Sequence, residues 1–121
     1  MRTWPAMKKG NVPNHLRHAA AILDKRGWTQ HVTHYKPTGA VDVGGAIALS
    51  FGVPEDRLSQ NMDEMAGYAP EAKYAFLLAC WDYLEHFIRE YPTDWNDSIS
   101  RTEDEIKRTL NAAADELDAT L

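Results

Sequence analysis

The chain has 121 residues, of which 44% are hydrophobic and 26% are charged, and it carries a net charge of −5. This composition is typical of one small globular domain and excludes a fibrous or wholly disordered chain. The longest apolar run, residues 75–81, is far shorter than the ~20 residues of a membrane span. The absence of an apolar leader segment and the single cysteine, Cys80, favour a cytoplasmic protein.

Charge is divided unevenly along the sequence. Residues 1–60 carry eight Lys or Arg and four Asp or Glu, whereas residues 61–121 carry five and fourteen. A basic first helix favours nucleic-acid binding, but the overall acidity opposes binding to phosphates, so a nucleic acid is only a weaker alternative. We expect the two halves to pack on each other, or on a second copy, through complementary charges.

The N-terminal third is predicted to contain an arm, a helix and an ambiguous segment. Residues 1–13 form an irregular arm anchored by Trp4 and Met7, and residues 14–121 form a single helical domain. The first helix is capped by Asn14, has a regular apolar stripe and ends in a left-handed Gly27. Residues 29–41 fit either a short β-hairpin or a structured loop.

The middle of the chain is predicted to hold one buried helix and one short one. Asp42 is placed to cap a helix through Phe51, in which Gly44 and Gly45 indicate the close approach of another backbone. A short helix is expected over residues 55–61, followed by a connector over residues 62–69 that contains one helical turn.

The strongest periodic signal begins at Pro70. Apolar residues recur every three or four positions to Tyr91, and the helix they predict is apolar almost all round and ends at Pro92. We therefore expect a mainly α fold, a compact bundle of four to five helices around this central buried helix, residues 70–91. A loop over residues 93–100 precedes a last helix that begins with a Thr102–Glu105 capping box.

Three short segments of the chain form a recognisable set. They are Gly-Trp-x-Gln at residues 27–30, residues 39–47 ending in Gly-Ala-Ile, and Trp-Asn-Asp at residues 95–97 followed by Arg101-Thr102. In this order they resemble a domain family of unknown function from actinobacteria and their phages. With the first helix, which ends in the first segment, and the closing amphipathic helix after the third, they span residues 14 to about 117. The family pattern usually has a cysteine where this chain has Asp42, so thiol chemistry does not apply there. The resemblance implies a compact domain of phage or actinobacterial origin and supplies no reaction.

Four histidines are weak metal-ligand candidates. They form two pairs with the same spacing, His15-x-x-His18 and His31-x-x-His34. On a helix the first pair shares a face and could hold one metal ion, whereas on a strand the second pair points to opposite faces. Since no cysteine pair or His-Glu-x-x-His pattern accompanies them, exposed or hydrogen-bonded histidines are favoured, and no cofactor is expected.

A second set of residues forms either a ligand-binding loop or a structural one. In the structural interpretation, which we favour, Trp95 fills the core and Asn96 or Asp97 turns or caps the chain. Arg101 then holds the loop through Asp97 or Asp94. In the other interpretation the same loop forms a shallow binding cleft. The full set is Trp28, Gln30, Trp95, Asn96, Asp97 and Arg101.

Two functions from different classes follow from these observations. The favoured one is a small non-enzymatic cytoplasmic protein that binds an unidentified protein partner, and its aromatic residues also suit a homodimer. The alternative is a metal- or ligand-dependent enzyme that uses His31 or His34 together with Asp97. No catalytic residue is assigned, because no nucleophile or acid–base motif is present.

Overall fold

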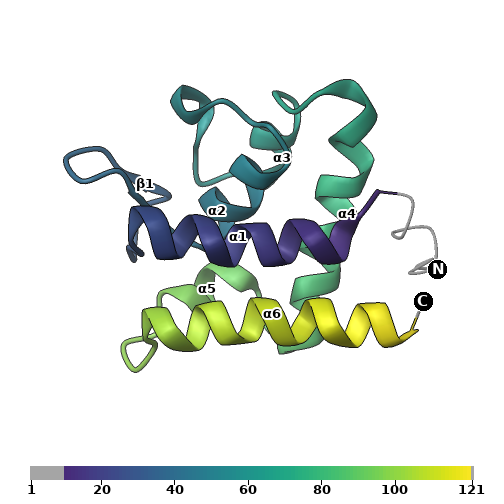
Figure 1. The fold of residues 1–121 in the computed structure, drawn as a ribbon. Coiled ribbons are helices and arrows are strands. Elements are labelled where there is room, and N and C mark those ends of the chain that lie inside the picture. The colour runs from purple at the N-terminus through teal and green to yellow at the C-terminus, as the bar shows by residue number, and fades with distance from the viewer. Residues whose placement is uncertain (1–9, 121) are drawn as a thin grey trace.

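The structure, a computed structural model, describes residues 10–120 (Figure 1). In this part of the chain, six α-helices pack together beside a two-stranded antiparallel hairpin, so the predicted mainly helical fold is confirmed. No helix in this range is long and apolar enough to cross a membrane. The predicted anchors Trp4 and Met7 lie outside the described residues. The elements are α1 (Val12–Arg26), β1 (His34–Tyr35), β2 (Ala40–Val41), α2 (Val43–Ser50), α3 (Met62–Ala66), α4 (Tyr74–Ile88), α5 (Pro92–Asn96) and α6 (Glu103–Thr120), with short 3-10 helices at Glu55–Arg57 and Glu71–Lys73.

Helix α1 begins earlier than predicted. Its N-cap is Asn11 rather than Asn14, because Pro13 occupies the first turn, where a residue without an N–H costs no hydrogen bond. The Asn14 side chain instead accepts a hydrogen bond from Arg17. Gly27 ends the helix with a φ of 91° and a ψ of 160°, so the positive φ is confirmed but the left-handed helical geometry is not.

Helices α1 and α6 lie side by side and run in opposite directions (Figure 1). Arg17 pairs with Asp115 at 3.0 Å and with Asp118 near one end, while Asp24 pairs with Lys107 at 2.9 Å near the other. The expected packing of the basic half on the acidic half holds for the two Arg17 pairs, whereas in the Asp24–Lys107 pair the acidic residue comes from the first half and the basic one from the second. Beneath these ion pairs lie the fully buried residues Leu16, Ala19, Leu23, Ile106, Leu110, Ala113, Ala114 and Leu117.

The most enclosed helix is α2, not the helix after Pro70. Every residue of α2 except Leu49 is buried, and Asp42 caps it as predicted, accepting from the Gly45 N–H at 2.7 Å. Helix α4 buries a single face, which includes Leu77, Cys80, Trp81, Tyr83 and Leu84. The ends of its predicted apolar stripe, Tyr74 and Tyr91, remain 44% and 45% exposed.

Gly45 is required by the contact between α2 and the segment before the hairpin. A Cβ atom on Gly45 would lie 2.9 Å from the Thr33 carbonyl oxygen, whereas one on Gly44 would find its nearest atoms at 3.4 Å. We expect Gly45→Ala to lower the free energy of unfolding by about 1–2 kcal/mol, because the clash exceeds the gain in helix propensity. Gly44→Ala is the matched control, and equal effects of the two substitutions in urea denaturation would contradict this account.

Of the two structures predicted for residues 29–41, a β-hairpin or a structured loop, the protein forms the hairpin. His34 pairs with Val41 and Tyr35 with Ala40, and a further bridge joins Trp28 to Val41. Two-residue strands are too short to be stable alone, so the bridge and the burial of Val41 keep the hairpin in place.

Several boundaries in the second half differ from prediction. The helix expected over residues 55–61 is a single 3-10 turn, whereas the helical turn expected in the connector is α3. Helix α4 ends at Ile88, before a left-handed Arg89, so Pro92 opens α5 within the segment predicted as a loop. Thr102 accepts from the Glu105 N–H at 3.2 Å, but the Glu105 carboxylate binds Arg101 and does not complete the capping box.

Candidate functional site

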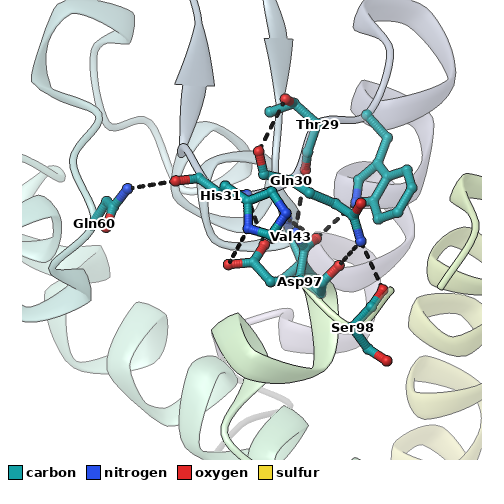
Figure 2. Close-up of polar contacts among 9 residues, drawn as sticks. Thr29, Gln30, His31, Val43, Gln60, Asp97 and Ser98 are labelled. Carbon is teal, nitrogen blue, oxygen red and sulfur yellow. Dashed lines mark hydrogen bonds and ion pairs between the residues drawn. The ribbon is translucent and has the colours of Figure 1, made fainter. Parts of the chain in front are cut away.

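A network of hydrogen bonds joins residues 28–31 to α5 and the loop that follows it (Figure 2). The Trp28 indole Nε1 donates to Asn96 Oδ1 at 2.7 Å. The Gln30 amide nitrogen donates to the carbonyl oxygens of Asn96, at 3.0 Å, and Ser98, at 2.9 Å. Segments separated by more than 60 residues in the sequence are thus held together by side chains that the sequence singles out.

Asn96 is the centre of this network and is completely buried. Its Oδ1 also accepts from the Val43 N–H at 3.0 Å, at the first residue of α2. Its Nδ2 donates to the Thr29 carbonyl at 3.2 Å and to Asp97 Oδ1 at 2.9 Å. Both lone-pair positions and both N–H groups of the amide are therefore used inside the protein. A ligand could reach Asn96 only by displacing one of these contacts.

Asp97 binds the backbone of His31. Asp97 Oδ1 accepts from the His31 N–H at 2.9 Å, while Gln60 donates to the His31 carbonyl at 3.0 Å (Figure 2). His31 has a φ of 71°, an unfavourable value for a residue with a Cβ, and these two hydrogen bonds hold it there. The His31 ring is exposed, with Nδ1 3.9 Å from Asp97 Oδ2.

Trp95 and Arg101 support the structural interpretation of the loop. Trp95 is only 5% exposed and belongs to the core, as that interpretation predicts. Arg101 Nε donates to the Trp95 carbonyl at 2.9 Å, and its guanidinium lies 5.0 Å from the centre of the Trp95 ring. Arg101 thus holds the loop, but its carboxylate partner is Glu105, at 2.7 Å, rather than Asp97 or Asp94.

The four histidines lie in different surroundings. His15 stacks on Phe51 at 3.8 Å and its Nδ1 lies 2.8 Å from the Ser50 carbonyl; burial lowers the pKa of this ring. His34 Nε2 is 3.2 Å from a carboxylate oxygen of Glu55. His18 is exposed beside Lys25 on α1, and His31 lies against Asp97. Within residues 10–120, no group of three or more His, Cys, Asp or Glu is arranged to hold a metal ion.

Asp42 is predicted from the sequence only as a helix cap, and its burial and raised pKa are not. It is 5% exposed, and burial, together with the nearby charge of Asp97, raises its pKa to about 7. The Gly45 N–H opposes this rise by stabilising the carboxylate. The signal in the sequence is an aspartate N-cap on a helix whose residues, apart from Ser50, are all apolar or glycine, so the carboxyl group lies among buried residues. Burial likewise raises the pKa of the Cys80 thiol, so this cysteine is unreactive.

The match to a known family extends over almost the whole chain and includes all of the site described above. The chain belongs to DUF6197, a family of unknown function, which matches residues 7–116. No curated protein and no solved structure is detectably similar to it. In this DUF6197 chain the matched region contains the hydrogen-bonded network, the buried Asp42 and the hairpin.

The basic surface of α1 is largely used inside the same DUF6197 domain. Arg17 pairs with two carboxylates of α6, and Arg26 binds Glu55 at 3.2 Å and the Gly39 carbonyl at 3.2 Å. A nucleic acid would have to compete with these internal partners for the positive charges of the helix.

Proposed function

We propose that this DUF6197 protein is a small, non-enzymatic interaction protein that binds a protein partner in the cytoplasm. The resemblance to actinobacterial and phage proteins supports an origin in such a cell or phage, with a host protein as the partner. The non-enzymatic part of the proposal is supported by the polar side chains of the candidate site, which form hydrogen bonds within the domain. They are Asn96, Gln30 and Arg101.

The observation that carries the proposal is the complete exposure of Ile99, a large apolar residue. Its side chain is 100% exposed on the loop between α5 and α6. The loop is held on both sides of Ile99: Gln30 binds the Ser98 carbonyl at 2.9 Å, and the Arg101 N–H binds the same oxygen at 3.0 Å. A large apolar side chain on a pre-formed loop loses little conformational entropy when a partner covers it, so more of the free energy of burying it is available for binding.

The proposal predicts a specific effect of replacing Ile99. Affinity capture from an actinobacterial lysate, with the captured partner then purified, gives a binding constant for the wild type. We expect Ile99→Ser to weaken that binding at least about tenfold, because it removes buried apolar area, while leaving the melting temperature unchanged. Tyr35→Ser, which truncates a side chain that is 47% exposed on β1, is the control. Equal affinities for all three proteins would contradict the proposal.

One observation favours the second candidate, a metal- or ligand-dependent enzyme. His31 and Asp97, two residues of that hypothesis, lie together, and the buried Asp42 is close enough to feel the charge of Asp97. A zinc titration that follows the His31 ring resonances tests this candidate. Saturable binding that Asp97→Asn abolishes would support it, and unchanged resonances would count against it.

A further inference from the structure

A cleft lies between the start of α3, one face of α4 and the segment that leads into α5. It has a volume of about 260 Å³. Ligand pockets for drug-sized molecules are larger, roughly 300–1,000 Å³, so the cleft suits one side chain rather than a whole cofactor. The residues that line it include Asn61, Asp63, Trp81, Asp82, Glu85 and Tyr91.

The rim of the cleft is negatively charged. Asp63, Asp82 and Glu85 contribute three carboxyl groups, and among the described residues that line the cleft there is no lysine, arginine or histidine. Among the described residues, neither Asp63 nor Glu85 forms an ion pair. Two acidic side chains from different elements, Asp63 of α3 and Glu85 of α4, therefore face one small space, and no described residue places a cation between these two.

Beside these carboxyl groups, the lining of the cleft includes two aromatic residues. Trp81 and Tyr91 meet edge to face, with ring centres 6.1 Å apart and planes at 88°. Trp81 is 8% exposed and Tyr91 is 45% exposed, so the tyrosine ring offers accessible π surface beside the carboxyl groups. An aromatic face attracts a cation electrostatically, and a planar guanidinium also stacks on it.

We propose that this cleft receives an arginine side chain of the protein partner. The inference rests on the proposed function and names the chemistry that the partner presents there. Carboxylates on two sides accept the N–H groups of one guanidinium, and the Tyr91 ring lies beside them. Arginine fits better than lysine because its planar group combines both kinds of contact, whereas an ammonium is a strongly hydrated point charge.

The cleft and Ile99 are connected through α5. Tyr91 precedes α5 and lines the cleft, whereas Asp97 and Ser98 follow α5 and lead to Ile99. A second link runs from Asn61 in the cleft, through the neighbouring Gln60, to the His31 backbone beside Asp97. One partner can therefore cover Ile99 and place an arginine in the cleft, because the two features lie at the two ends of a five-residue helix.

The test uses a capped Gly-Arg-Gly peptide and the same peptide with citrulline, which keeps the shape of arginine but lacks its charge. Binding is followed by backbone amide NMR shifts at low salt. We expect the arginine peptide to bind in the millimolar range and to shift amides of residues 61–63 and 81–91. The double variant Asp63→Asn/Glu85→Gln should weaken it at least about tenfold, because it removes the charged acceptors. Glu71→Gln, which neutralises an exposed carboxylate outside the cleft, should have no effect.

Two outcomes overturn the inference: equal binding of both peptides, and shifts that map away from the cleft. Failure here is distinguishable from failure of the proposed function. If the purified partner loses affinity for Ile99→Ser but binds Asp63→Asn/Glu85→Gln as tightly as the wild type, the arginine site is wrong and the interaction role stands. If the peptide occupies the cleft but Ile99→Ser leaves partner binding unchanged, the Ile99 contact is wrong and the arginine site stands.

Discussion

Replacing Asn96 by alanine should lower the free energy of unfolding by about 3–5 kcal/mol, because it leaves several buried polar groups without partners. The Trp28 indole N–H and the Val43 N–H both lose their acceptor, and the Thr29 carbonyl loses its donor. Asn96 is completely buried, so water cannot replace these contacts without opening the region between α2 and α5.

Urea denaturation of the wild type and the variant measures the effect of Asn96→Ala. Asn111→Ala is the matched control, because Asn111 is exposed on α6 and its side chain makes no hydrogen bond within residues 10–120. We expect the control to change stability by less than about 0.5 kcal/mol. A loss below about 1 kcal/mol for Asn96→Ala would show that the network does not hold the fold together.

Replacing Asp42 by asparagine should stabilise the protein above pH 7. The carboxyl pKa is 3.8 when unperturbed and about 7 in the folded protein, so folding favours the protonated form. The stability contributed by Asp42 is fully present below pH 3.8 and is lost as the pH rises through about 7. Asparagine keeps an acceptor for the Gly45 N–H without a charge, so its advantage over aspartate grows across this window, to at most about 4 kcal/mol.

The measurement is urea denaturation of both proteins at pH 4.5 and pH 8, where only the difference between them is compared. The contributions of the other titrating groups to the pH dependence of stability are the same in both proteins and cancel in this difference. Asp97→Asn serves as a second arm: it removes a nearby negative charge, so it should lower the pKa of Asp42 and move the window to lower pH. A difference between wild type and Asp42→Asn that is the same at both pH values would refute the raised pKa.

Sequence periodicity predicted the long helices well because their burial is local and regular. The stripe of α6 repeats at helical spacing and is buried at each of its apolar positions, from Ile106 to Leu117. For α4 the same reasoning overestimated burial. Apolar residues all round a helix do not determine how many other elements of the fold pack against it. Tyr74 and Tyr91 remain exposed. The most buried helix is instead α2, whose small residues allow neighbouring segments to approach its backbone closely.

The network around Asn96 could be predicted in its residues but not in its pairings. Trp28, Gln30, Asn96 and Asp97 were all selected from sequence, yet the segments they join are separated by more than 60 residues. A single sequence contains no information on which distant amide meets which carbonyl. The partner of Arg101 was missed for a simpler reason: Glu105 lies one helical turn away and is held beside it by α6, whereas Asp94 and Asp97 belong to a separate turn.

The antiparallel pairing of α1 with α6 has a consequence for synthesis on the ribosome. Helix α1 packs on α2 and, more extensively, on α6, whose buried residues 106–117 are translated about ninety positions after residues 16–23. Until then, the part of α1 that packs on α6 stays uncovered in the nascent chain, and such surfaces are prone to aggregate or to recruit chaperones. Folding of this domain therefore awaits the emergence of α6 from the exit tunnel, and a stalled or truncated translation product lacking α6 is expected to be insoluble.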